Sequence, residues 1–235
     1  MSRERKDLQK TATSSEVDAF LRQMASTPRR PAAGGRLIFA MDATASREPT
    51  WDRASQIQAA MFDETTSLGG LSVQLCFYRG FLEFGASPWC AEADALRKRM
   101  TQVHCVTGLT QIGRVLQHAL AEHERGRVNA LIFVGDCLEE NPDELAGLAG
   151  KLGLTGLPVF VFHEGRDPAA ERSFRQLARL SGGAYAPFDA SSPQTLRDLL
   201  SAVAVFAAGG RQALEQFGRQ RGGVALRLIH QITRS

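Results

Sequence analysis

The sequence has no long hydrophobic run. The longest apolar runs, such as Leu37–Met41 and Ala130–Val134, are far shorter than the ~20 residues that a membrane-spanning helix needs. The N-terminal stretch MSRERKDLQKTATSSEVDAF also lacks the apolar core of a signal peptide. We therefore expect a soluble cytoplasmic protein with no membrane partner.

Cysteine is sparse and shows no paired spacing. No two of Cys76, Cys90, Cys105 and Cys137 form a C-x-x-C pair, and their spacing matches no zinc pattern. Their number alone would allow two disulfides in a secreted protein. Because no signal peptide is visible, we expect reduced thiols, with Cys76 buried in a strand.

Neither sign of charge is concentrated in the chain. The 28 basic and 25 acidic residues give a formal net charge of +3. A nucleic-acid-binding protein more often shows a basic stripe with stacking aromatic side chains, and neither is visible. We therefore expect no nucleic-acid partner.

The length of 235 residues suits one α/β domain with a short extension at each end. Residues 1–35 form an N-terminal extension with a candidate short helix over Glu16–Met24 and a linker rich in proline and glycine over Thr27–Gly35. Residues 36–208 form the domain. The apolar residues of the C-terminal tail, 209–235, favour packing on the domain over partner binding.

Short apolar runs alternate with amphipathic stretches through the domain. The predicted strands are Leu37–Met41, Leu71–Tyr78, Phe81–Phe84, Ala130–Val134, Pro158–Phe162 and Gly182–Phe188. The predicted helices are Pro49–Leu68, Glu92–Met100, Thr110–Glu124, Asp143–Leu152, Ala169–Leu180 and Pro193–Ala207.

Continuous apolar strands separated by helices predict an α/β fold with a doubly wound, mostly parallel six-stranded sheet and helices on both faces. The hairpin at Arg79-Gly80 supplies one antiparallel edge strand to this Rossmann-like sheet. Binding sites in such folds form at the carboxyl ends of the strands, near a topological switch point.

Oxygen-bearing side chains occupy three of the predicted strand ends. Asp42, Thr44 and Ser46 alternate directly after the first strand, so one loop can aim all three the same way. Thr110 is placed as the N-cap or first residue of a helix, and Asp136 follows the strand LIFVG. Carboxylates and hydroxyls make a hard oxygen site, suited to Mg²⁺ or Mn²⁺ and poor for zinc.

These residues resemble the metal-ion-dependent adhesion site of the von Willebrand factor A (VWA) family, written D-x-S-x-S, then Thr, then Asp, on three loops. Asp42, Thr44 and Ser46 match the first element, with Thr in place of the first Ser. Thr110 lies in TGLTQIGRVLQHAL, which is similar to the family's G-G-T-x-I-G-x-A-L, and Asp136 matches the final Asp.

The resemblance covers roughly Arg36 to Ala208, and Leu177–Asp189 is similar to the family stretch before the last strand. It implies a bacterial intracellular, metal-dependent protein-binding module rather than an enzyme. Its bound cation would coordinate an Asp or Glu of a partner protein, for which a chaperone or an ATPase assembly is the implied class. Cys137 and Leu109 depart from the family, since Gly is usual at both positions.

Other polar side chains flank the predicted metal site. We expect a partner-binding rim that consists of Cys137, Glu139, Glu140, His163 and Glu164. A simpler interpretation stays open for the acidic residues after Asp136, which complement the dipole of the following helix. His163 also fits an ordinary loop histidine.

Two other functions stay open. The first is a Mg²⁺-dependent phosphatase of the haloacid-dehalogenase type, with Asp42 as nucleophile. Thr44 stands where that family carries its acid/base Asp, and neither Lys98 nor Lys151 has the setting of the lysine it requires. The second is a VWA scaffold with a degenerate, metal-free site, which the departures at Leu109 and Cys137 suggest.

Overall fold

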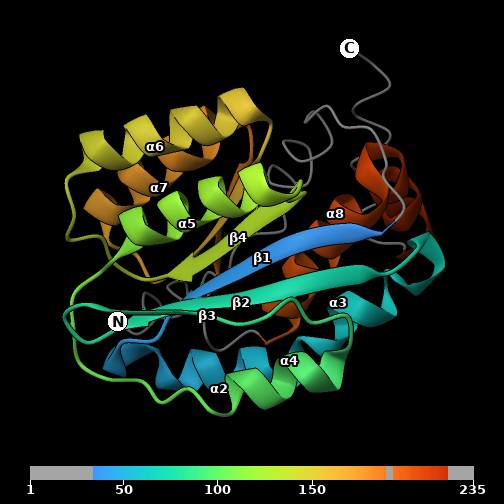
Figure 1. The fold of residues 1–235 in the computed structure, drawn as a ribbon, viewed down its shortest axis with the longest axis horizontal. Helices are drawn as coiled ribbons and strands as arrows, with labels where there is room; N and C mark the ends of the chain where they lie inside the picture. Colours follow the sequence, from blue (N-terminus) through green and yellow to red (C-terminus); the bar gives the residue numbers. More distant parts are fainter. Residues whose placement is uncertain (1–33, 189–192, 222–235) are drawn as a thin grey trace, which may run out of the picture.

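The computed structural model describes residues 34–188 and 193–221 (Figure 1). The predicted helix Glu16–Met24, almost all of the linker and the apolar part of the C-terminal tail lie outside these residues. The division into extension, domain and tail therefore stays a proposal. Among the described residues, no helix is both long enough and apolar enough to cross a membrane.

The predicted fold class is confirmed. The described strands form one six-stranded sheet in the order β3-β2-β1-β4-β5-β6. All neighbours are parallel except β2 and β3, so β3 is the antiparallel edge strand. The strands are β1 (Gly35–Asp42), β2 (Leu71–Arg79), β3 (Glu83–Ala86), β4 (Ala130–Gly135), β5 (Val159–Glu164) and β6 (Ala184–Phe188).

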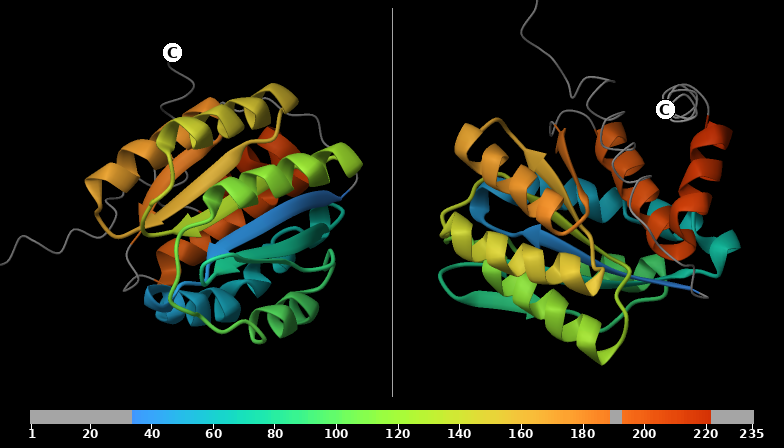
Figure 2. Two further views of the ribbon diagram at one scale, coloured as in Figure 1. Left: turned by 60° about the vertical axis from the view of Figure 1, so that its left-hand side comes forward. Right: turned by 90° about the horizontal axis from the view of Figure 1, so that it is seen from above.

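Helices cover both faces of the sheet, with α5, α6 and α7 on one side and α2, α3, α4 and α8 on the other (Figures 1 and 2). They are α2 (Glu48–Ile57), α3 (Ala59–Asp63), α4 (Ala93–Met100), α5 (Ile112–Arg125), α6 (Pro142–Thr155), α7 (Pro168–Leu180) and α8 (Pro193–Arg221). Short 3₁₀ helices occur at Ala45–Arg47 (η1) and Thr66–Leu68 (η2).

The central strand β1 shows why its sequence is continuously apolar. Ile38 and Ala40 pack into the core under α5, α6 and α7, whereas Leu37, Phe39 and Met41 pack into the core under α2 and α8. Successive side chains of a strand point to opposite faces, so a strand covered on both sides needs apolar residues at every position. All five side chains are buried.

The predicted helix Pro49–Leu68 is wrong, because the chain breaks into α2, α3 and η2. The Thr65 hydroxyl donates to the carbonyl of Met61 at 2.9 Å, and the Thr66 hydroxyl donates to that of Phe62 at 3.0 Å. Such side-chain bonds offer the backbone an alternative to helix continuation. Gly69 then leaves the helix with a φ of 94°.

Two other predicted boundaries also differ. Residues 80–82 form the turn between β2 and β3, so the edge strand begins at Glu83 instead of Phe81. The last helix continues past Ala207 to Arg221, with a kink at Gly210, where φ is 70° and ψ is −163°. Glycine adopts this backbone conformation without the steric penalty that other residues meet.

Candidate metal centre

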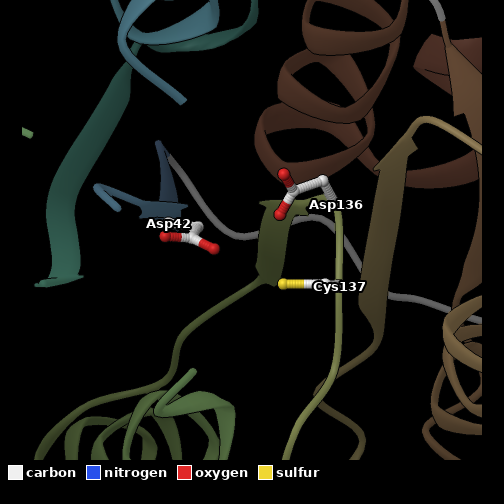
Figure 3. Close-up of side chains that lie close together, drawn as sticks. All are labelled: Asp42, Asp136 and Cys137. Carbon is white, nitrogen blue, oxygen red and sulfur yellow. The ribbon is translucent and has the colours of Figure 1, made fainter. Parts of the chain in front are cut away.

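The strand order places a topological switch point between β1 and β4. From β1 the chain proceeds to β2 on one side, and it returns to β4 on the other. Asp42 ends β1, and Asp136 and Cys137 directly follow β4. Their side chains point toward one space between the two strand ends (Figure 3), and one ligand atom from each lies within 4.8 Å of the others.

The first loop connects four of the five predicted ligands. The Thr44 amide donates to Asp42 Oδ1 at 2.7 Å, which turns the chain at the end of β1. The hydroxyl oxygens of Thr44 and Ser46 lie 3.4 Å apart, and Ser46 Oγ donates to Asp136 Oδ2 at 3.1 Å. Oxygen atoms from both strand ends are therefore already in contact.

Thr110, the fifth predicted ligand, contacts the loop after β4. Its amide donates to Glu139 Oε2 at 2.9 Å, and its hydroxyl accepts from the Glu139 amide at 3.0 Å. The predicted capping role of Thr110 is wrong, because α5 begins at Ile112. The Glu140 carboxylate instead accepts from the first amides of that helix, Ile112 at 2.5 Å and Gly113 at 2.8 Å.

Two carboxylate oxygens at the switch point are buried and lack a hydrogen-bond partner among the described residues. They are Asp42 Oδ2 and Asp136 Oδ1. Burial is the main cause that raises the pKa of Asp42, and the neighbouring Asp136 adds to it. An ionised carboxylate without a partner is costly to bury, so the arrangement fits residues that hold a cation.

Arg47 is a neighbour of these carboxylates that the sequence did not reveal. Its side chain is 3% exposed, forms an ion pair with Glu164 and lies 3.7 Å from Asp136 Oδ2 through Nη1. Glu164 also accepts from the Thr50 hydroxyl at 2.5 Å. Nothing in the sequence around Arg47 indicates that its guanidinium is buried.

These contacts set the charge of the site. Asp42, Asp136 and Glu164 contribute three carboxylates, and Arg47 contributes one guanidinium. Three negative charges and one positive charge leave a net charge of −2 when all four groups are ionised. One divalent cation would neutralise that charge, and the hydroxyls of Thr44 and Ser46 are hard oxygen donors beside it.

The predicted exposed rim needs correction. His163 is fully buried within β5, with Nδ1 at 2.8 Å from the Tyr185 hydroxyl and Nε2 at 3.1 Å from the Asp136 carbonyl oxygen. Burial lowers the pKa of His163. It supports the loop from beneath and is neither a rim residue nor a loop histidine. The carboxylates of Glu139, Glu140 and Glu164 all form internal contacts, although Glu139 as a whole is exposed and Cys137 is half-buried.

Four apolar side chains on loops that adjoin the predicted metal site are exposed. Phe81 is 72% exposed, Leu82 82%, Val106 44% and Leu109 47%, and we call these four residues the apolar loop patch. Backbone hydrogen bonds join their loops, since the Leu109 amide donates to the Gly80 carbonyl at 3.1 Å.

The apolar loop patch also adjoins the metal loop. The Val106 amide donates to the Ala43 carbonyl at 3.0 Å, one residue after Asp42. At Gly108 an added Cβ would lie 1.9 Å from the Gly80 carbonyl oxygen, so only glycine permits this approach of the two loops.

Comparisons with known proteins agree on the architecture. No protein-family model matches the sequence, and no curated protein matches it either. Among solved structures, the von Willebrand factor type A protein from Catenulispora acidiphila is similar with a TM-score of 0.56 at 17% identity, and the match covers 74% of this chain and 43% of that one.

Two further structures resemble the chain at 14% identity. An aerotolerance-related membrane protein from Bacteroides fragilis gives a TM-score of 0.54, and the match covers 71% of this chain and 98% of that one. Proximal thread matrix protein 1 from the mussel byssus, solved with a zinc-occupied MIDAS motif, gives 0.57, with 74% and 47% covered. At these identities the likeness concerns the fold alone, and the chain has a VWA-like fold.

Proposed function

We propose that the protein is a metal-dependent protein-interaction module. Asp42 and Asp136 would hold a divalent cation, with the hydroxyls of Thr44, Ser46 and Thr110 as direct or water-mediated ligands. The observation that carries the proposal is the pair of buried, unpartnered carboxylate oxygens, Asp42 Oδ2 and Asp136 Oδ1, at the switch point of the described sheet. A bound cation would supply a coordination position for a carboxylate of a partner protein.

The hard oxygen donors support Mg²⁺ or Mn²⁺ as the cation. The resemblance in the sequence further suggests a cytoplasmic partner of the chaperone or ATPase class. The absence of a basic stripe in the sequence supports a protein rather than a nucleic-acid partner.

A library of random peptides displayed on phage tests the proposal while the partner is still unidentified. We expect peptides selected in Mg²⁺ to share an Asp or Glu and to dissociate in EDTA. An Asp136→Ala variant should retain none of them, because it lacks one of the two carboxylates. Selected peptides without an acidic residue, or binding that EDTA leaves unchanged, would support the metal-free scaffold instead.

The apolar loop patch adds a second expectation for the selected peptides. Apolar residues beside the acidic one would bury Phe81 and Leu82, whose burial is worth roughly 1.5–3 kcal/mol each. We expect the double substitution Phe81→Ser and Leu82→Ser to weaken peptide binding at least about tenfold.

Isothermal titration calorimetry of one selected peptide measures this effect, and Mn²⁺ affinity should stay constant. Leu154→Ser is the matched control, since Leu154 is 91% exposed on α6. Equal peptide affinities for the double variant and this control would show that the apolar loop patch does not contribute to peptide binding.

The phosphatase hypothesis receives no support from the positions of its candidate groups. Glu140, which would belong to that family's later acidic motif, caps α5 with both carboxylate oxygens. Lys98 and Lys151 are exposed on α4 and α6. The residue two positions after Asp42 is Thr44, which cannot act as the carboxylic acid/base that the reaction requires.

A further inference from the structure

The third side chain at the switch point is a thiol, which the all-oxygen description of the site does not use. Cys137 is half-buried, and its sulfur points toward the space that the Asp42 and Asp136 carboxylates share (Figure 3). One ligand atom from each of the three residues lies within 4.8 Å of the other two. The other cysteines lie outside this group: Cys76 and Cys90 are buried in the two cores, and Cys105 packs beside one of them.

The thiol of Cys137 lies beside two carboxylates that could share a ligand with it. Asp42 is 0% exposed, and its Oδ2 has no hydrogen-bond partner among the described residues. A cysteine packed only to fill space would need no buried charged group beside it. Here the sulfur lies within 4.8 Å of a carboxylate oxygen of Asp42, a fully buried residue.

We propose that Cys137 is a metal ligand and that the site prefers zinc and other thiophilic divalent cations to Mg²⁺. This inference rests on the metal site proposed above and revises its ion: the oxygen donors alone would favour Mg²⁺ or Mn²⁺, and the added thiol shifts the preference to a thiophilic ion. Thiolate is a soft ligand that selects Zn²⁺, whereas Mg²⁺ favours oxygen alone. Two carboxylates and one thiolate supply three protein ligands, and the fourth position of a tetrahedral ion is left for water or a partner's carboxylate.

A metal ion would draw the three ligand atoms closer together. In a tetrahedral site, Zn–S bonds of about 2.3 Å and Zn–O bonds of about 2.0–2.2 Å place two ligand atoms about 3.3–3.7 Å apart. The ligand atoms of the present group lie within 4.8 Å of one another, so side-chain adjustments of at most about 1.5 Å would complete the site. As the metal–sulfur bond forms, the S–H bond breaks and its proton passes to solvent water.

Cobalt(II) is a suitable spectroscopic probe because it takes tetrahedral zinc sites and absorbs light. We expect a Co²⁺ titration of the full chain to give a sulfur-to-cobalt charge-transfer band in the near ultraviolet. Cys137→Ser should bind Co²⁺ without that band, and Cys105→Ser should leave the band unchanged. In competition, Cys137→Ser should lower the preference for Zn²⁺ over Mg²⁺ at least about tenfold.

The outcomes separate this inference from the function on which it rests. If the wild-type protein binds Co²⁺ without a charge-transfer band, the metal site stands and the thiol is excluded as a ligand. Protein that binds neither ion overturns both proposals. If Cys137→Ser does not fold, a second experiment uses the wild-type protein. In that experiment, mass spectrometry measures the rate at which iodoacetamide alkylates Cys137. Zn²⁺ should slow that reaction strongly and Mg²⁺ should not, whereas equal rates would exclude the thiol ligand.

Discussion

Replacement of Glu164 by Leu lowers the free energy of unfolding by about 3–5 kcal/mol, the usual cost of removing one partner from a buried ion pair. The Arg47 guanidinium is 3% exposed, and its ion pair with Glu164 is the closer of its two carboxylate contacts. Without Glu164, the guanidinium stays buried, and among the described residues Asp136 Oδ2, at 3.7 Å, is its remaining carboxylate contact. Urea denaturation monitored by circular dichroism measures the loss.

A double variant separates the charge from the packing. Arg47→Met combined with Glu164→Leu removes both charges and keeps similar volume, so we expect it to recover most of the lost stability. Glu171→Leu is the matched control, because the Glu171–Arg175 pair on α7 is exposed and worth at most about 0.5 kcal/mol. A cost for Glu164→Leu no larger than for Glu171→Leu would show that Arg47 is solvated.

Replacement of Asp42 by Asn weakens divalent-cation binding at least about 100-fold. Substitutions around metal ligands already cost about 10–100-fold, and Asp42 contributes one of the two carboxylates. The same change should stabilise the metal-free protein by about 1–3 kcal/mol. Asparagine can keep the acceptor for the Thr44 amide, and it removes a buried carboxylate oxygen that lacks a partner among the described residues.

Two measurements test these opposite effects. Mn²⁺ titration followed by electron paramagnetic resonance gives the affinity, and urea denaturation in EDTA gives the stability. Asp143→Asn is the control, since Asp143 is an exposed acidic residue at the start of α6. Unchanged Mn²⁺ binding in Asp42→Asn would contradict the metal site. A destabilised metal-free Asp42→Asn would show that the carboxylate already has a compensating partner.

The sheet and the positions of Asp42 and Asp136 could be predicted from the sequence for one physical reason. A parallel strand buried on both faces is continuously apolar, so the first charged residue after it marks its carboxyl end. Right-handed crossovers then bring the carboxyl ends of parallel strands to the same edge of the sheet. Local pattern and chain topology together therefore placed both carboxylates.

The features that escaped prediction depend on contacts between loops far apart in the sequence. Arg47 turns inward because Glu164, 117 residues later in the chain, supplies its counter-charge. Glu140 caps a helix that begins 28 residues before it. His163 is buried because Tyr185 and the Asp136 carbonyl satisfy its ring nitrogens. No local sequence pattern encodes these pairings.

The Glu140 cap on α5 has a consequence for how such a module would be switched. A free helix N-terminus attracts anions, but here an internal carboxylate already occupies the first amides. Without a cation, the switch point therefore offers an incoming Asp or Glu a net negative charge, because the three carboxylates outnumber the Arg47 guanidinium. The metal-free protein would repel its acidic ligand. Partner binding would therefore depend more strongly on the concentration of metal than on the concentration of the partner.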